Sequence, residues 1–256
     1  MNSEVLYYMW LNKTRGVGPI LANNLIEYFG DIKEVYHADM PELLKVNGIG
    51  EKLAKIIFNN KDLDISKRII EKCNNSDIKI IDKNSSNYPK QLKQYPKAPL
   101  ILYVRGQLKE FESSVAIVGS RRCTEYGKIV TVELAESLSL KKIPIISGMA
   151  KGIDSYAHTI AINSNNYTIA VLGTGVDNCY PKEHLTLMNK IIETGVVISQ
   201  FEPEINNSKE NFLIRNELIA MLADKMVIVQ ASKESGALYT AACGLKYNRE
   251  VYAVPA

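Results

Sequence analysis

The feature that most limits how this chain folds is an alternation of short apolar segments with longer helical ones, from Val115 to the end. Runs of β-branched and small apolar residues predict buried strands at Val115–Val118, Ile143–Ser147, Thr168–Leu172, Val196–Ser199, Met226–Gln230 and Val251–Val254. The segments between them predict helices at Glu125–Leu140, Ile153–Ile162, Glu183–Ile192, Phe212–Leu222 and Gly236–Tyr247. This alternation implies an α/β fold with a doubly wound parallel sheet, extended Rossmann-like in type, whose crossovers are right-handed.

The region before the sheet, residues 1 to about 75, predicts a small all-α domain that contains two related hairpins. LNKTRGVGPILANNLIEYF and LLKVNGIGEKLAKIIF share the pattern apolar–x–Gly–apolar–Gly followed by an amphipathic helix, with Gly16 and Gly18 in one copy and Gly48 and Gly50 in the other. The repeat resembles the helix-hairpin-helix family, in a SAM-like domain, and this resemblance implies helix N-termini that offer amides to a DNA phosphate. Two interpretations stay open, which are direct contact with DNA and a module that packs or binds protein.

Residues from about 76 to 111 are predicted to join the edge of the sheet and not to form a free linker. Ile78–Ile81 and Leu100–Val104 have the composition of strands, and Gly106 closes the second of them. Prolines at positions 89, 96 and 99 exclude a long helix. We therefore expect two domains, a helix-hairpin-helix domain over residues 1–75 and a Rossmann-like domain over residues 76–256.

Composition and charge exclude several classes of protein. A net charge of +3 is too small to indicate a nucleic-acid partner by itself, so any basic site has to be a local patch. The four cysteines form no CxxC pair and the three histidines are scattered, which argues for a reducing compartment and against a metal site. The sequence has neither a signal-peptide pattern nor an apolar run of about 18 residues, so we expect a cytoplasmic protein without a membrane span.

Polar residues suited to binding an anion gather where the predicted strands end. The segment VAIVGSRR places Gly119, Ser120 and Arg121 directly after the first strand, at the edge where open α/β folds bind ligands. The following helix adds backbone N–H groups and the positive end of its dipole. Together these groups predict an anion site, with phosphate as the best-fitting anion. The alternative is that Arg121 and Arg122 are solvated surface residues.

Three later residues are candidates for the same edge, each with a structural alternative. Lys151, in SGMAKGIDSYAH, either binds phosphate or points into water. Arg215, which Asn216 follows, either grips a phosphate or pairs with Glu217 or another local carboxylate. Phe212 lies on the same helix face as Arg215 and either stacks on a base or belongs to the core.

The motifs of nucleotide-binding enzymes are incomplete in this chain. Gly173 and Gly175 form only a lone GxG, while the GxGxxG and GxxxxGK[ST] patterns are absent. Asp154 and His158 share a helix face, either as an acid–base pair or, as we favour, as residues that fix a loop. We therefore expect no cofactor and no catalytic residue.

Five motifs taken in order, IVGSR, SGMAKGIDSYAH, TIAVLGTGVDNCYP, FLIRN and SGALYTAACG, closely resemble the DNA-processing protein A family (DprA, also called Smf). The resemblance covers about residues 80 to 256. It implies a protein that binds single-stranded DNA without chemistry, forms a homodimer and loads a RecA-type recombinase onto DNA taken up in natural transformation. It also implies that one groove holds the DNA, through Gly119, Ser120, Arg121, Lys209, Phe212, Arg215 and Asn216. We add Lys151 to these residues because it lies at the same edge of the sheet.

The sequence departs from this family pattern at several positions. Glu217 stands where a second Arg is usual, and we expect it to weaken the positive groove locally. Gln200 and Gln230 replace the glutamates that commonly follow the fourth and fifth strands. The chain stops at Pro255–Ala256, where the family usually has Pro–Gly and a further segment.

Two classes of function remain from the sequence. One is a single-stranded DNA-binding recombination mediator, and the other is a nucleotide-processing enzyme of the phosphoribohydrolase type on a related fold. Enzymes of that type carry a PGGxGTxxE motif with a catalytic Glu, whereas the nearest segment here, SGALYT, has none. The sequence therefore favours the DNA-binding protein and predicts no turnover.

Overall fold

The computed structural model describes residues 4–232 and 235–255. The first three residues of the predicted helical domain, and Ala256 of the Pro–Ala ending, lie outside these ranges. The chain forms two compact units, one made of residues 1–88 and 93–102 and the other of residues 89–92 and 103–256.

The first unit is helical up to residue 75, as the sequence predicts. Its helices are α1 (Glu4–Lys13), α2 (Pro19–Phe29), α3 (Ile32–His37), α4 (Met40–Leu43), α5 (Glu51–Asn59) and α6 (Asp64–Asn75). The large side chains of α1 fill its centre, where Trp10 and Leu11 are fully buried.

The two glycine hairpins pack against each other reciprocally. Gly16 and Gly48 take φ values of 86° and 84°, in the left-handed region that favours glycine. A Cβ on Gly48 would lie 2.7 Å from Cδ2 of Leu21, and one on Gly16 would lie 3.2 Å from Cδ1 of Leu53. Leu21 and Leu53 occupy equivalent positions in α2 and α5. Each hairpin therefore seats its tight turn on the helix of the other.

An eight-stranded sheet runs in the order β1-β2-β6-β5-β4-β3-β7-β8. The strands are β1 (Lys79–Asp82), β2 (Ile101–Gly106), β3 (Val115–Val118), β4 (Ile145–Ser147), β5 (Thr168–Val171), β6 (Val196–Ser199), β7 (Lys225–Ile228) and β8 (Glu250–Ala253). All neighbours from β6 to β8 in this order are parallel. β2 pairs antiparallel with β6. The predicted doubly wound sheet, with the segment before Val115 joined to its edge, is thus confirmed.

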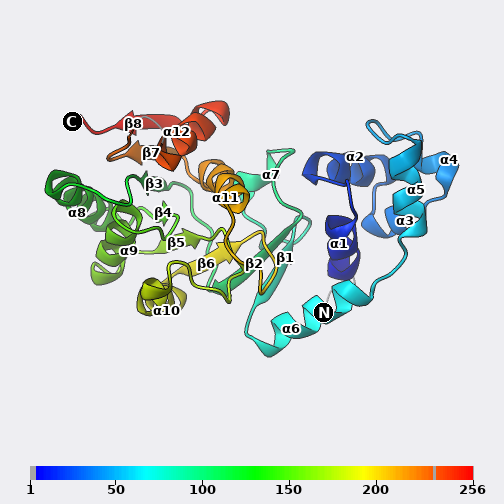
Figure 1. Ribbon diagram of the computed structural model, residues 1–256, viewed down its shortest axis with the longest axis horizontal. Helices are drawn as coiled ribbons and strands as arrows, with labels where there is room; N and C mark the ends of the chain where they lie inside the picture. The colour runs from blue at the N-terminus through cyan, green and yellow to red at the C-terminus, as the bar shows by residue number, and fades with distance from the viewer. Residues whose placement is uncertain (1–3, 233–234, 256) are drawn as a thin grey trace. The chain divides into compact units, whose positions relative to one another are not determined.

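Helices cover the parallel part of the sheet in two groups (Figure 1). The helices are α8 (Glu125–Leu140), α9 (Ile153–Asn163), α10 (Leu185–Thr194), α11 (Lys209–Leu222) and α12 (Gly236–Lys246), with a short α7 (Lys90–Lys93) before β2. The connections from β3 to β6 move stepwise in one direction, whereas those through α11 and α12 move in the other. Right-handed crossovers therefore put α8, α9 and α10 on one face and α11 and α12 on the other.

The direction of winding reverses at β3, which lies between β4 and β7. In open α/β sheets, ligands bind outside the carboxyl ends of the strands at such a reversal. The loops after β3 and β7 meet there, above a core that includes Ile117, Ile145 and Ile153. Among the described residues, no helix is long and apolar enough to cross a membrane.

Candidate functional site

A groove opens at the strand ends where the winding reverses. We call it the strand-end groove. Its lining comes mainly from the loop after β3, the first half of α11 and the start of α12, with Ala150 and Asp154 from the segment after β4 and Ser232 from the loop after β7. The sequence-predicted residues that line it are Gly119, Ser120, Arg121, Lys209, Phe212, Arg215 and Asn216.

The loop after β3 is held in one shape by local contacts. The Ser120 hydroxyl accepts from the Arg122 N–H at 3.1 Å and donates to the Arg122 carbonyl at 2.9 Å. A Cβ on Gly119 would lie 2.6 Å from Cγ1 of Ile153, so glycine here allows α9 to approach the strand end closely. The Gln230 side-chain carbonyl accepts from the Thr124 N–H at 2.9 Å and ties this loop to the end of β7. The loop therefore presents its two arginines from a fixed backbone.

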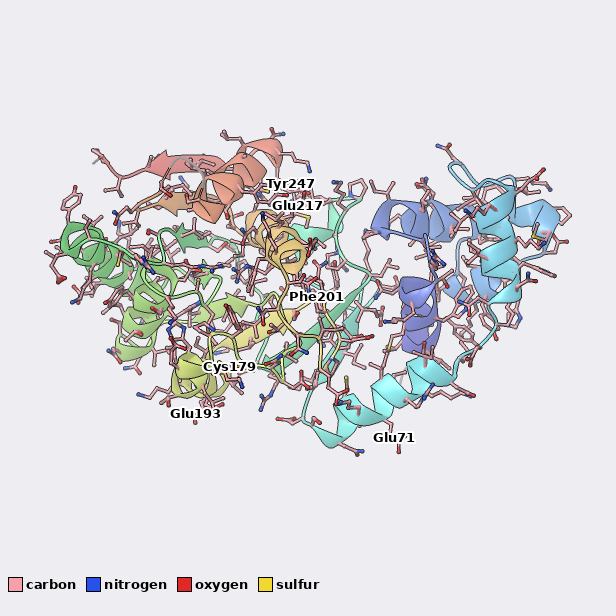
Figure 2. The ribbon with its side chains drawn as sticks, in the orientation of Figure 1. Glu71, Cys179, Glu193, Phe201, Glu217 and Tyr247 are labelled. Carbon is pink, nitrogen blue, oxygen red and sulfur yellow. The ribbon has the colours of Figure 1, made fainter. Side chains whose placement is uncertain are left out.

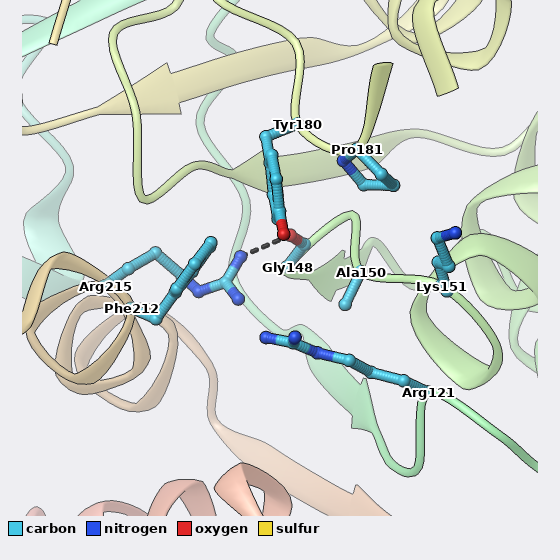
Figure 3. Close-up of a pocket in the computed structure, with 8 residues that line it drawn as sticks. All are labelled: Arg121, Gly148, Ala150, Lys151, Tyr180, Pro181, Phe212 and Arg215. Carbon is cyan, nitrogen blue, oxygen red and sulfur yellow. Dashed lines mark hydrogen bonds between the residues drawn. The ribbon is translucent and has the colours of Figure 1, made fainter. Parts of the chain in front are cut away.

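Phe212 lies beside two guanidinium groups at the groove. The central guanidinium carbon lies 5.5 Å from the Phe212 ring centroid for Arg121 and 5.7 Å for Arg215. Figure 3 shows the Arg121 guanidinium and the Phe212 ring directed into the same space. Arg121 is exposed, and the ring is half-buried. Phe212 is therefore a rim residue of the groove and not a core phenylalanine.

Arg215 occupies a very different environment, since only 5% of it is exposed. Its Nη1 donates to the carbonyl of Gly148 and, at 2.7 Å, to that of Val171 (Figure 3). Its Nε donates to Oδ1 of Asn216 at 2.9 Å. Burial lowers the pKa of Arg215 to about 10, with the Asp154 carboxylate opposing that shift, so the group stays charged at neutral pH. Arg215 supports the groove from below and ties α11 to the ends of β4 and β5.

Asp154 fixes a loop, as the sequence analysis favours, but His158 is not its partner. The Asp154 carboxylate accepts from the N–H groups of Gly148 and Ala150, both at 3.2 Å. Nδ1 of His158 lies 2.7 Å from the hydroxyl of Thr168 instead. Burial, followed by the charge of Arg215, lowers the pKa of His158 to about 3, so the imidazole is neutral at pH 7. The two residues thus do not form an acid–base pair.

The two lysine candidates are both exposed but differ in their contacts. Lys209 is the first residue of α11 and lines the strand-end groove. Lys151 forms an ion pair with Glu183. It is therefore neither a freely solvated lysine nor an unpaired cation that faces the groove. It lines a smaller neighbouring pocket, at the side opposite Phe212 (Figure 3).

Two expectations about charge near the groove are wrong. Glu217 accepts from the Tyr247 hydroxyl at 2.8 Å and pairs with Lys246 at 3.3 Å, so it ties α11 to α12 instead of weakening the groove (Figure 2). Alternation along an extended backbone predicts that Arg122 points away from Arg121, and this prediction is also incorrect. Both arginines line the strand-end groove, because the Ser120 turn replaces the extended backbone on which alternation depends.

Sequence reasoning missed two residues of the site. Gln230 anchors the β3 loop, although it is a single glutamine with no pattern that signals this contact. Tyr180, in the loop after β5, has its ring centroid 5.5 Å from that of Phe212. In the sequence, Tyr180 stands out only as part of the segment TIAVLGTGVDNCYP. No spacing in the sequence predicts its contact with Phe212.

The fold and the groove define a class of protein, a Rossmann-like α/β protein with cations and aromatic rings at its strand ends. Exposed guanidinium and ammonium groups beside a ring suit an anionic ligand that carries flat apolar groups. The chain belongs to the DNA recombination-mediator protein A family, whose model matches residues 79–256. A helix-hairpin-helix motif model matches residues 14–62. The resemblances seen in the sequence are thereby confirmed.

Individual relatives are similar over most of this chain. Protein Smf of Synechocystis is 32% identical over 259 residues, which cover 99% of this chain and 65% of that protein. DNA processing protein DprA of Bacillus subtilis is 33% identical over 190 residues, covering 73% of this chain and 64% of that protein. The chain thus spans slightly less than two thirds of the length of these curated relatives.

Two solved structures share the architecture. DNA processing protein A from Streptococcus pneumoniae superposes with a TM-score of 0.83 at 28% identity, covering 98% of this chain and 87% of that one. DNA processing protein A from Helicobacter pylori, a structure described for its single-stranded DNA binding mode, gives a TM-score of 0.65 at 30% identity. That match covers 70% of this chain and 81% of the other.

Proposed function

We propose that this protein binds single-stranded DNA in the strand-end groove and acts as a recombination mediator, without catalysing a reaction. The observation that carries the proposal is the exposed Arg121 guanidinium above the half-buried Phe212 ring. A cation and a ring at one place fit a strand whose phosphates and bases are both accessible. The bases of a duplex are stacked inside it and cannot reach the ring in the same way.

The cations of the groove give the proposal its chemistry. Arg121, Arg122 and Lys209 are exposed and lie on two segments that face one hollow. Arg121 and Ser120 are the phosphate-binding residues in this proposal, with Lys209 beside them and Phe212 as the base platform. Gly119, Arg215 and Asn216 shape the groove from beneath, and Lys151 has a minor part because Glu183 already engages it.

The recombination step of the proposal comes from the family. We propose that two copies associate through the α12 and β8 end of the sheet, where Leu238, Leu245 and Tyr252 are exposed. Two grooves in one dimer would engage one strand with higher avidity than either groove alone. The dimer then loads a RecA-type recombinase onto DNA that enters the cytoplasm in natural transformation.

The test is a competition titration by fluorescence anisotropy with labelled oligo(dT), a duplex of equal length and mononucleotides. The proposal predicts tighter binding to oligo(dT) than to duplex, little dependence on base sequence and weaker binding at higher salt. Equal affinity for both forms would contradict it. Steady hydrolysis of a nucleoside monophosphate that is lost in Asp154→Asn would support the enzyme class instead.

A further inference from the structure

The loop after β3, which carries the two arginines of the groove rim, is held at both of its ends. At its start, the Ser120 carbonyl accepts from the Ile153 N–H at 3.3 Å, which fastens the loop to α9. At its end, Oε1 of Gln230 accepts from the Thr124 N–H at 2.9 Å and from the Thr124 hydroxyl at 3.3 Å. The arginines therefore lie between one main-chain contact and one side-chain contact.

The Gln230 contact also reaches the first turn of α8. Thr124 is the N-cap of α8, and its hydroxyl accepts from the Gly127 N–H at 3.1 Å. A Cβ on Gly127 would lie 2.7 Å from Oε1 of Gln230, so glycine at this place in the helix makes room for the amide. The Gln230 side chain thus fits a space that the start of α8 leaves open.

The register of the sheet brings Gln230 to this loop. β3 and β7 are parallel neighbours, with Val118 opposite Ile228. The Val229 N–H then donates to the Val118 carbonyl at 3.0 Å, and Gln230 is the next residue. The carboxyl ends of both strands meet at one edge, so a side chain that follows β7 can fix the loop that follows β3.

An amide at position 230 supplies an acceptor without adding a charge. Thr124 presents an N–H and an O–H at this contact, and a carboxylate could accept from them as well as an amide does. Within residues 4–232 and 235–255, neither Arg121 nor Arg122 forms an ion pair. Gln230 therefore holds the loop and leaves the charge of both arginines for an anionic ligand.

We propose that Gln230 is a positioning residue for DNA binding, which holds the loop after β3 in the shape that presents Arg121 to a phosphate. Gln230 is half-buried and is not among the residues that line the strand-end groove, so it acts on the ligand through the loop. This inference rests on the proposed function and adds to it a residue outside the groove lining that sets the affinity.

The experiment measures binding to oligo(dT) by anisotropy for wild type, Gln230→Met and Gln230→Glu. Methionine keeps the size of the side chain but removes the acceptor, and should weaken binding by about three- to tenfold, the effect of one lost hydrogen bond. Glutamate keeps the acceptor and should stay within about threefold of wild type, because solvent and salt screen the added charge.

The matched control is Gln91→Met in α7, another half-buried glutamine. Its Nε2 donates to the Phe111 carbonyl at 2.8 Å, so the substitution removes a comparable hydrogen bond that does not involve the loop. This variant should bind oligo(dT) like wild type.

A double-mutant cycle with Arg121→Ala separates positioning from a general loss of structure. If Gln230 acts through Arg121, Gln230→Met should cause no further loss of affinity in the Arg121→Ala background. Equal losses in both backgrounds, or no loss in either, would overturn the role of Gln230. In both of those cases wild type still binds oligo(dT). If wild type binds no single strand at all, the proposed function itself has failed.

Discussion

Two arginines flank the same phenylalanine ring but belong to different regions of the molecule. Arg121 lies on the exposed rim of the groove, and Arg215 lies in the buried support beneath it. Their distances to the Phe212 ring are nearly equal, so proximity to the ring does not distinguish them. What distinguishes them is the set of partners, since Arg215 donates to two main-chain carbonyls and to Asn216.

This difference teaches which kind of change each region tolerates. A buried charge that satisfies several groups is coupled to folding, because its removal leaves those groups without partners in a low-dielectric interior. An exposed cation is coupled to the ligand and only weakly to stability. The rim and the support are therefore expected to separate in experiments that measure binding and unfolding independently.

The largest expected effect is on stability, from Arg215→Ala. The substitution leaves the carbonyls of Gly148 and Val171 without this donor and the buried Asp154 carboxylate without its nearby positive charge, and should lower the free energy of unfolding by about 3–5 kcal/mol. Urea denaturation followed by circular dichroism measures this change. A variant that unfolds like wild type yet binds no single-stranded DNA would place Arg215 among the phosphate-binding residues instead.

The next effect is on binding, from Arg121→Ala. Loss of one charge-assisted contact should weaken binding to oligo(dT) by about 1.5–3 kcal/mol, roughly ten- to a hundredfold. The slope of log affinity against log salt should fall by about 0.7. Its unfolding free energy should change by only about 0.5 kcal/mol or less.

The matched control for that variant is Lys141→Ala. Lys141 is also exposed, but it follows α8 and precedes β4, so it lies at the amino edge of the sheet, away from the groove. Lys141→Ala also removes one positive charge, and it should leave the affinity for oligo(dT) and the salt slope unchanged. Equal losses in the two variants would mean that net charge, and not the rim, governs binding.

A somewhat smaller effect is expected from pH, through His158 in the support. The folded state keeps His158 neutral with a pKa of about 3, whereas the unfolded chain takes up a proton below about pH 6.5. The contribution of His158 to the free energy of unfolding is therefore fully present above that pH. It is lost as the pH falls, by about 2 kcal/mol between pH 7 and pH 5. His158→Gln should show a shallower loss over this interval, and an identical loss would exclude His158 as its source.

The smallest effect is expected at Lys151. Exposed ion pairs contribute about 0–1 kcal/mol, so neither Lys151→Ala nor Glu183→Gln should change stability measurably. Glu183→Gln frees the lysine and should strengthen binding to oligo(dT) slightly, by less than about twofold, whereas Lys151→Ala should weaken it by a similar amount. A tenfold loss in Lys151→Ala would move this residue to the primary phosphate contacts.

Much of the fold could be predicted from the sequence because its signals are local. The helix at Glu125–Leu140 and the strands at Val115–Val118 and Val196–Ser199 have the predicted bounds, since their apolar runs end at Gly, Ser or Thr residues. β8 and β7 each begin one residue earlier than predicted, at Glu250 and Lys225, because exposed polar residues extend these outer strands.

The position of the candidate site could be predicted from the sequence, but the different roles of its residues could not. Strand ends can be located from sequence, and these placed Arg121 and Phe212 at one edge. Whether an arginine there is exposed or buried depends on loops from β4 and β5 that close over Arg215, which are long-range contacts without a sequence period. The contact between Tyr180 and Phe212 is also long-range, so it could not be predicted from the sequence.

The most direct test of the groove is hydrogen–deuterium exchange with and without saturating oligo(dT). Binding in the groove predicts slower exchange on adding DNA in residues 119–124 and 205–213, the loop after β3 and the start of α11. The loops after β1 and β2 should be unaffected. Slower exchange confined to the hairpin turns at residues 14–18 and 46–50, with none at residues 119–124, would contradict binding in the groove.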